Sequence, residues 1–555
     1  MPHSTYSIGL DFGTLSGRAV LIDHQSGREI ASCDYVYPHA VMEKTLPGED
    51  RPLPEGYALH HPQDYLDALP ALLKGILEKS GVDPRDITGI GVDTTATTII
   101  PLDDQDMPLC FREEFRNNPH AWIKLWKHHT TQPQADRLNA LAQEQKKGFL
   151  QRCGGKVSAE WYWPKVMEIA KEAPEVYENA HSIVELADWI AFLLTHEKKR
   201  CQFIAAFHAH DYQSDYGMDE DFLRALDPLL IRQAEKNQRW PQQKLLTRTG
   251  GLQADLAART GLIPGTAVAV ACTDSPIAML SMGITREEDA VLIMGTSGML
   301  MFYSKKDVCI PGAMGTAENA LLPGHTLHLF GQSAVGDIYQ WFVNHLAPHS
   351  YYLEAQEKGE SIYQLLNRKI AAIPPDSPLP IALDWMNGNR CLLQNANLSG
   401  VMAGLTLSTT ADQIYRALIE ATAFGLKKML DAAREAGVSV KSIRACGGIA
   451  YKSPEIMQIY ADILELPIST SSCSQPNAQG SAIMGAMAAG SQNGGYDDIL
   501  MAVAAMQCPM VRTYQPCSRH QAAYRRRYRH YCQMHQHFGV DQKEMTEEIR
   551  RPTFI

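Results

Sequence analysis

Tyr6-Ser-Ile-Gly-Leu-Asp-Phe-Gly-Thr-Leu-Ser-Gly-Arg-Ala-Val-Leu-Ile-Asp23 is the stretch of sequence that decides the fold. Its apolar residues form two short runs around a glycine-bearing turn, which predicts two strands joined as a β-hairpin with Asp11 at the bend. Gly9 and Gly13 would let the backbone come close to a ligand. The hairpin therefore predicts a site where the main chain touches a bound molecule.

The turn of this hairpin also carries the donors and the charge that a phosphate site needs. Thr14 and Ser16 offer hydroxyl groups and backbone amides to phosphate oxygens. Asp11 offers a carboxylate of the kind that holds hydrated Mg²⁺. Because Asp-x-Gly turns also occur for their geometry alone, this stretch leaves the functional and the structural interpretation open.

Length and composition limit the class of protein. A chain of 555 residues exceeds what one hydrophobic core usually supports, so two large domains are expected. An apolar content of 45% and a charged content of 20% are typical of a globular protein. The net charge of −11 argues against nucleic acid as the main partner, although a phosphate ligand can still bind in a locally positive cleft.

The N-terminus and the cysteines indicate the compartment. Met-Pro-His-Ser lacks a basic region followed by an apolar core, and no apolar run is long enough to cross a bilayer. The expectation is a cytoplasmic chain with no membrane partner. The 12 cysteines contain no Cys-x-x-Cys pair, so we expect reduced, mostly buried thiols.

Strand-like and helix-like segments alternate along the chain, which predicts an α/β fold that is partly antiparallel. The expected strands are residues 87–93, 267–271, 290–294 and 443–446, and the expected helices are residues 62–80, 411–437 and 454–466. A strand ending in Gly295-Thr-Ser-Gly298 and followed by residues 299–303 resembles the opening hairpin. The chain is thus expected to use one phosphate-holding device twice, by duplication of a whole domain.

We expect a domain boundary near Gly261-Leu-Ile-Pro-Gly265, where a helical stretch gives way to a strand. This divides the chain into residues 1–265, residues 266–515 and a basic C-terminal tail of residues 516–555. The tail contains Tyr524-Arg-Arg-Arg-Tyr-Arg-His-Tyr531, which we interpret as a solvated terminal helix.

Phosphoryl transfer needs donors around the phosphate, a metal ion and a carboxylate that deprotonates the attacking hydroxyl. Asp274 follows a buried strand in Ala271-Cys-Thr-Asp-Ser-Pro276, where side chains emerge into a cleft. The alternative role for Asp274 is a helix N-cap before Ser275-Pro276. Cys446-Gly-Gly-Ile-Ala450 could let the backbone pass against an adenine, whereas Walker A and Rossmann glycine motifs are absent from the sequence.

Three aromatic and polar segments have the composition of a sugar site. Aromatic faces stack on a sugar and polar groups pair with its hydroxyls, although tryptophan-rich stretches are also common in cores. The segments are Trp126-Lys-His-His129, Glu160-Trp-Tyr-Trp163 and Asp384-Trp-Met-Asn-Gly-Asn-Arg390.

Taken together, these motifs make the chain resemble the FGGY carbohydrate kinases, and within that family the ribulokinases. The resemblance runs from the hairpin to about Gly490. Its most specific parts are Gly9-Leu-Asp-Phe-Gly-Thr14, Gly89-Ile-Gly-Val-Asp93, Asn118-Pro-His-Ala-Trp-Ile-Lys-Leu-Trp-Lys-His-His129, Gly331-Gln-Ser-Ala-Val-Gly-Asp-Ile338, Leu383-Asp-Trp-Met-Asn-Gly-Asn-Arg390, Ile419-Glu-Ala-Thr-Ala-Phe-Gly425 and Cys446-Gly-Gly-Ile449.

The resemblance implies two actin-like, ribonuclease-H-like domains with an interdomain cleft that closes over ATP and a sugar. It implies Mg²⁺ as cofactor and phosphorylation of a terminal hydroxyl of a ketopentose, with L-ribulose to L-ribulose 5-phosphate as first choice. A homodimer is a further expectation. The matching positions are Asp274 as catalytic base, Asp11 at the metal, Thr14, Ser16, Gly295, Thr296, Ser297, Gly447 and Gly448 at the nucleotide, and Ala96, Trp126, Lys127 and Asp274 at the sugar.

Departures from the ribulokinase pattern concern mostly the sugar side. Leu329 stands where ribulokinases have a glutamate, and Cys201-Gln-Phe-Ile-Ala-Ala-Phe-His208 lacks their lysine, with His208 or His210 as stand-ins. Ser453 replaces an asparagine of the adenine loop. Another ketose such as D-ribulose, xylulose or a deoxyketose, or a catalytically weak sugar- or nucleotide-binding regulator, is therefore the alternative.

Overall fold

The computed structural model describes residues 4–207 and 217–550, and it divides into two compact units. The first unit contains the chain up to Thr285 together with Asn319–Pro323 and Gln475–Cys508, and the second unit contains the remainder. The main division thus lies 20 residues beyond the boundary expected at residue 265. The strands at Ala267–Ala269 and Cys272–Thr273 pair with Ile87–Thr94 of the first unit, which is why the chain stays in that unit longer.

The first unit is built on a mixed sheet. The opening hairpin forms as predicted, with β1 (Tyr6–Phe12) antiparallel to β2 (Ser16–Asp23), but Asp11 lies within β1 and the bend follows it. On the other side of β1 the pairing is parallel. The strand order is β11 (Arg248–Gly251), β12 (Ala267–Ala269), β5 (Ile87–Thr94), β1, β2 and β3 (Glu29–Val36), and β13 (Cys272–Thr273) also pairs with β5.

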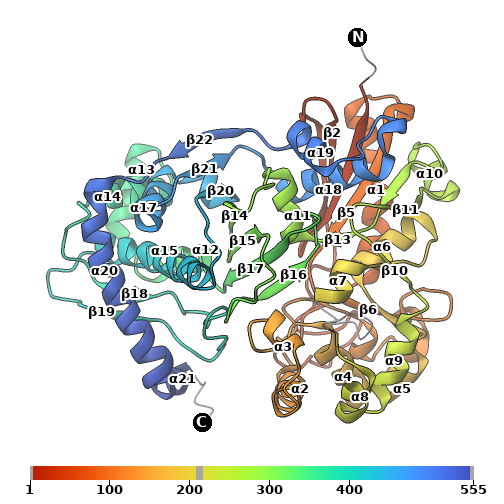
Figure 1. Cartoon of the computed structure of the whole chain (residues 1–555), viewed down its shortest axis with the longest axis horizontal. Coiled ribbons are helices and arrows are strands. Elements are labelled where there is room, and N and C mark those ends of the chain that lie inside the picture. The colour runs from red at the N-terminus through yellow and green to blue at the C-terminus, as the bar shows by residue number, and fades with distance from the viewer. Residues whose placement is uncertain (1–3, 208–216, 551–555) are drawn as a thin grey trace. The chain divides into compact units, whose positions relative to one another are not determined.

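Helix α18 (Pro476–Ala489) lies directly against β1 and β5, although it comes late in the sequence; Figure 1 shows this blue helix among the early strands. A Cβ atom on Gly9 would lie 1.7 Å from the Ala478 carbonyl oxygen, and one on Gly91 would lie 1.8 Å from that of Ser481. The expectation that Gly9 brings the backbone close to a ligand is therefore wrong. Gly9 makes room for a helix.

A second sheet of the first unit has the order β4 (Leu59–His60), β7 (Ile123–Lys124), β6 (Ile99–Leu102) and β8 (Ser182–Glu185). Around it lies an apolar core that includes Trp161, Tyr162 and Trp163. The helices that contribute to this core include α2 (Gln132–Glu144), α4 (Tyr162–Glu172), α5 (Pro174–Asn179), α8 (Glu220–Leu226) and α9 (Leu229–Asn237). Helix α1 (Pro62–Ser80), which matches the predicted helix residue for residue, packs on β2 and β3.

The second unit repeats the plan of the first sheet. Strands β14 and β15 are antiparallel, β15 and β17 are antiparallel, and β14, β20 and β21 run parallel. The predicted repetition of the hairpin is thus present as a repeated strand order. That order is β16 (Gly315–Glu318), β17 (Thr326–Gln332), β15 (Gly298–Ser304), β14 (Asp289–Met294), β20 (Ser442–Cys446), β21 (Ile468–Ser471) and β22 (Met510–Tyr514).

The helices of the second unit pack around a large apolar cluster. The predicted helices at residues 411–437 and 454–466 are α15 (Ala411–Glu435) and α17 (Pro454–Leu464). Further helices of this unit are α12 (Gly336–His345), α13 (His349–Lys358), α14 (Ile362–Ala371) and α16 (Gly448–Lys452).

The basic segment near the C-terminus forms α20 (Ser518–Gln536), but the expectation that this helix is solvated is wrong. Tyr524, Arg527 and Tyr531 are buried in the second unit. The Arg527 guanidinium lies 2.7 Å from the Glu420 carboxylate, and the Tyr531 hydroxyl donates to Asp384 at 2.8 Å. One face of α20 is therefore part of the core, because its cations and hydroxyls have partners there.

None of the helices that the structure describes is both long and apolar enough to span a membrane. All 12 cysteines are free thiols, and most of them are buried, as expected from the sequence.

Candidate active site

Three aspartates lie at the ends of adjacent parallel strands in the first unit. Asp11 of β1 is paired in register with Asp93 of β5, and Asp93 is paired in register with Cys272 of β13. Asp274 begins α11 (Asp274–Ser281) directly after β13. Because parallel strands end at the same edge of the sheet, the fold gathers the three carboxyl groups there.

Burial and mutual repulsion raise the pKa values of these carboxyls. Burial, together with the charge of Asp11, raises the pKa of Asp93 well above its usual range. Burial also raises the pKa of Asp11, although the Arg18 guanidinium, 3.6 Å away, opposes the rise. Asp93 accepts a hydrogen bond of 2.5 Å from the Ser481 hydroxyl of α18. Asp93 was not singled out from the sequence as a site residue, although the register of two parallel strands places it beside Asp11.

Asp274 has the environment of a general base. Its Oδ1 accepts hydrogen bonds from the Ser275 amide at 2.7 Å and from the Ser275 hydroxyl at 3.2 Å, which fix the carboxylate. Burial, with the charge of Asp11 as the next cause, raises the pKa of Asp274 to about 6. The N-cap position belongs to Thr273, so Asp274 is the first helical residue and not the cap. A carboxylate with this pKa is ionised at neutral pH and accepts protons more readily than an ordinary aspartate.

The turn of the hairpin lies next to one of the predicted sugar residues. The Gly13 amide donates to the Ser16 carbonyl at 3.0 Å and closes the turn. The Trp126 indole N–H donates to the Thr14 hydroxyl at 3.2 Å. Thr14, Ser16 and Trp126 are all partly exposed, so a ligand can reach them. The structure therefore joins a predicted phosphate residue to a predicted sugar residue within one unit.

Ala96 and Lys127 also belong to the first unit. Ala96 follows β5 and is partly exposed, and its carbonyl accepts from the Thr98 hydroxyl at 3.2 Å. Thr97 has φ 51, a left-handed conformation that β-branched residues rarely adopt. The Lys127 ammonium forms an ion pair of 2.7 Å with Glu43. Because of that partner, the charge of Lys127 is already balanced.

The predicted nucleotide residues of the second unit form two neighbouring turns. Gly295 and Thr296 are exposed after β14, and their carbonyls accept from Gly336 at 3.0 Å and from Val335 at 2.8 Å. Ser297 is partly exposed and its carbonyl accepts from the Gly295 amide at 3.0 Å. These bonds leave the surface of the turn open to a ligand while they hold its backbone.

The second of these turns follows β20. Gly447 has φ 98, and a Cβ atom there would lie 2.3 Å from the Met294 carbonyl at the end of β14, so only glycine fits. Gly448, in contrast, is exposed, and a Cβ atom there would have no heavy atom within 4 Å. Ser453, the departure from the family pattern, ends α16.

Two of the aromatic segments predicted to bind sugar are packed in cores instead. Trp163 of the first unit is 2% exposed, and Trp385 of the second unit is 1% exposed. Asp384 uses its carboxylate to accept from Gln332 and Tyr531. The indole rings of Trp163 and Trp385 cannot stack on a sugar, because other side chains already cover them.

The positions that depart from the ribulokinase pattern are only partly described. Leu329 is a buried residue of β17, paired with Met301 and Gly315. His208 and His210, the stand-ins for the missing lysine, lie outside the described residues. The departure at position 329 therefore places a buried apolar side chain in the sheet of the second unit.

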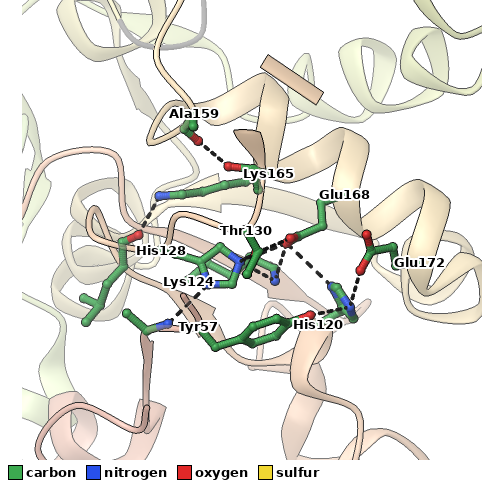
Figure 2. Close-up of polar contacts among 12 residues, drawn as sticks. Tyr57, His120, Lys124, His128, Thr130, Ala159, Lys165, Glu168 and Glu172 are labelled. Carbon is green, nitrogen blue, oxygen red and sulfur yellow. Dashed lines mark hydrogen bonds and ion pairs between the residues drawn. The ribbon is translucent and has the colours of Figure 1, made fainter. Parts of the chain in front are cut away.

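The segment around Trp126 also builds a buried polar group that the sequence did not reveal; Figure 2 shows it converging on Glu168 of α4. Glu168 lies 2.8 Å from the Lys124 ammonium and 2.9 Å from the His128 imidazole. These partners lower the pKa of Glu168 far below its usual range, against the effect of burial. Lys124 and His128 stand four residues apart in a motif that is not helical, so helical spacing could not pair them with Glu168.

Comparison with known proteins places these features in a family. A family model described as the FGGY family of carbohydrate kinases, N-terminal domain, matches residues 6–208, and the C-terminal domain model matches residues 290–489. The ribulokinase of Bacillus licheniformis is 43% identical over 532 residues, which are 96% of this chain and 96% of that protein. The ribulokinase of Geobacillus thermodenitrificans is 40% identical over 98% of this chain and 96% of that protein.

Solved structures show the same fold. The xylulose kinase from Rhodospirillum rubrum superimposes with a TM-score of 0.76 at 23% identity and covers 96% of this chain and 99% of its own. The gluconate kinase from Lactobacillus acidophilus gives a TM-score of 0.79 at 18% identity, covering 98% of this chain and 100% of its own. The two-domain α/β architecture predicted from the sequence is thus confirmed.

Proposed function

Because this chain belongs to the FGGY family of carbohydrate kinases, we propose that it transfers the γ-phosphoryl group of ATP to a terminal hydroxyl of a ketopentose, with L-ribulose as first choice. The product would be L-ribulose 5-phosphate, as in arabinose catabolism. The observation that carries the proposal is the position of Asp274, which begins α11 at the strand ends that also hold Asp11 and Asp93. The ribulokinase relatives at 43% and 40% identity support the choice of sugar.

The proposed chemistry assigns one role to each of four groups of residues. Asp274 accepts the proton of the attacking sugar hydroxyl while the oxygen of that hydroxyl bonds to the γ-phosphorus. The bond between the γ-phosphorus and the oxygen that bridges it to the β-phosphate breaks, and ADP is released. Thr14 and Ser16 donate to phosphate oxygens, and so do the amides of residues 295–297. Gly447 and Gly448 let the backbone lie along the adenine. Ala96, Trp126 and Lys127 contact the sugar.

The residues fit a Mg²⁺ ion bound mainly through phosphate oxygens. Magnesium usually takes one or two protein carboxylates and completes its shell with water and phosphate. Asp11 would provide that carboxylate, and Asp93 adds a buried Oδ1 for which no hydrogen bond is found among the described residues. In the described ranges, no three His, Cys, Asp or Glu side chains form a complete metal cage. The ion would neutralise charge on the transferred phosphoryl group.

A panel of ketoses tests the proposal. Purified chain is assayed with Mg²⁺-ATP and L-ribulose, D-ribulose, L- and D-xylulose and a deoxyketose, with ADP release as the readout. We expect the highest kcat/KM for L-ribulose. Leu329, which supplies no charge at a position where ribulokinases have glutamate, motivates the other ketoses as alternatives. ADP release that is the same with and without every sugar would contradict a kinase and favour the regulator.

The assembly is a separate question. We keep a homodimer as a prediction, for which sedimentation velocity at several protein concentrations is the measurement. A single species with the mass of one 61.6 kDa chain would contradict it.

A further inference from the structure

Lys165 is a fully buried lysine of α4 that binds the main chain. Its side chain has 0% exposure, and its ammonium donates to the Thr97 carbonyl at 2.5 Å and to the Leu125 carbonyl at 2.7 Å. An ammonium is costly to bury, so its few hydrogen bonds must be well placed. Lys165 therefore joins two segments that are far apart in the sequence.

The two carbonyls belong to residues adjacent to two proposed sugar contacts. Thr97 follows Ala96 in the loop after β5. Leu125 precedes Trp126, whose indole N–H donates to Thr14 at the hairpin turn. The lysine thus fixes the loop after β5 and the Trp126 segment at a set distance from each other.

The loop after β5 needs such a contact. Thr97 is β-branched and has φ 51, a conformation that persists only where the surroundings determine it. The Thr95 and Thr98 hydroxyls lie 2.8 Å apart, and the Leu186 amide donates to the Thr98 carbonyl at 2.7 Å. Together with Lys165, these bonds hold the carbonyls that follow Ala96.

Charges around Lys165 show that it is not simply a partner in the neighbouring ion-pair group. Burial lowers the pKa of Lys165 to about 7, which the nearby carboxylates of Glu185 and Glu160 oppose. Glu168 also faces it, but the Glu168 carboxylate is bound by Lys124, His128 and Thr130. In Figure 2 the Lys165 side chain extends away from Glu168 toward the main chain.

We propose that Lys165 is a positioning residue for the ketose: by clasping the Thr97 and Leu125 carbonyls, it sets Ala96 and Trp126 at the separation that the sugar requires. This inference rests on the proposed function. It concerns the sugar alone, because both carbonyls that the lysine binds adjoin proposed sugar contacts.

Replacement of Lys165 by methionine tests the inference, with Lys236→Met as a matched control. Lys236 of α9 also donates to two carbonyls of the first unit, those of Tyr177 and Ala180, at 3.2 and 2.6 Å. KM and kcat are measured for the best ketose of the panel and for ATP. We expect Lys165→Met to raise the ketose KM about 10- to 100-fold, because small misplacements of binding groups cost that much. The KM for ATP should stay within about twofold, as should both constants of Lys236→Met.

Lys165→Gln is the second variant, in case Lys165→Met does not fold. The glutamine amide keeps two N–H donors but carries no charge. We expect an intermediate rise in ketose KM. An unchanged ketose KM in a folded variant, or equal rises for ketose and ATP, overturns the positioning role alone. A native chain that turns over no ketose overturns the proposed function and this inference with it.

Discussion

The two sheets share a strand order but carry different residues where their central strands end. In the first unit the paired ends of β1 and β5 present Asp11 and Asp93, whereas the matching pair of β14 and β20 in the second unit is Ile293 and Cys446. Duplicated topology therefore does not duplicate chemistry. At these strand ends the carboxylates belong to the first unit, and in the second unit the same ends lead into the exposed turns at Gly295 and Gly448.

The glycines of the two units differ in the same way. Gly9, Gly89 and Gly91 of the first unit face α18, where a Cβ atom would meet helix backbone at 2.1 Å or less. Gly295 and Gly448 of the second unit have no heavy atom within 4 Å of such a Cβ. At these positions glycine serves close packing in the first unit and leaves exposed space in the second, where Gly447 is the closely packed neighbour of Gly448.

The largest effect that would sharpen this comparison is expected from Asp274→Asn. Loss of the general base should lower kcat by about 10²- to 10⁴-fold, since this is the usual contribution of such a group. The variant should also be more stable at pH 8, by about 1 to 3 kcal/mol, because its side chain no longer holds a charge whose pKa is raised to about 6. Steady-state kinetics and urea unfolding measure the two effects.

Ile293→Ala is the control for that experiment. Ile293 lies at the end of β14 in the second unit, the position that matches Asp11 of β1, and it carries no titratable group. A variant that loses as much turnover as Asp274→Asn would break the contrast between the units. Full activity of Asp274→Asn would remove the proposed base altogether.

The next effect concerns packing in the first unit. Gly9→Ala places a methyl group 1.7 Å from the Ala478 carbonyl oxygen, so the backbone of α18 must move. We expect a loss of about 3 kcal/mol in the free energy of unfolding, at the upper end of overpacking costs. Gly13→Ala is the matched control, because its nearest contact is the Ser16 carbonyl at 3.4 Å. Chemical denaturation of both variants measures the difference, and equal stabilities would return Gly9 to the role of a ligand contact.

The sequence was sufficient for local structure and for the fold class. The helix at Pro62–Ser80 and the hairpin were predicted because apolar periodicity and glycine turns are local signals. The return of α18 to the first unit could not be predicted, because nothing local in Pro476–Ala489 says which sheet it covers. Gly9, Gly89 and Gly91 make room for this helix. Their structural role can be recognised only once α18 is known to pack against them.

The site was predicted in part for the same reason. Asp11 and Asp274 follow apolar strand patterns, whereas Asp93 acquires its role only from the parallel register with β1. Lys165 and Glu168 lie on a helix whose buried face also carries Trp163, so composition alone favours a core. Of the two interpretations left open for Asp384-Trp385, the structure shows core packing, because a polar and aromatic pair can be satisfied by interior partners as well as by a ligand.

A smaller effect is expected at the adenine-side turn of the second unit. Gly448→Ala should leave the free energy of unfolding unchanged within about 0.5 kcal/mol, since the new methyl group meets nothing. It should raise the KM for ATP about tenfold if the nucleotide lies against the backbone there. Gly447→Ala, in contrast, should destabilise the protein, because φ 98 and the Met294 carbonyl at 2.3 Å both exclude a side chain. An ATP KM unaffected in Gly448→Ala would place the nucleotide elsewhere.

The smallest effect is a pH dependence of the first unit, which holds Asp11, Asp93 and Asp274 at its strand ends. Asp274 must be ionised to act as base, and its pKa is raised to about 6, so kcat/KM for the ketose should fall about tenfold per pH unit below that value. The sign for stability is opposite: a carboxyl whose folded pKa is raised binds a proton more tightly in the folded chain. Stability from this group therefore falls as pH rises from about 4 to about 6. In Asp274→Asn this fall should shrink, measured by urea unfolding at pH 4.5 and 7. Equal pH dependence of stability in the variant and the native chain would mean that Asp274 is not the group whose charge the first unit resists, and that Asp93 or Asp11 carries the whole effect.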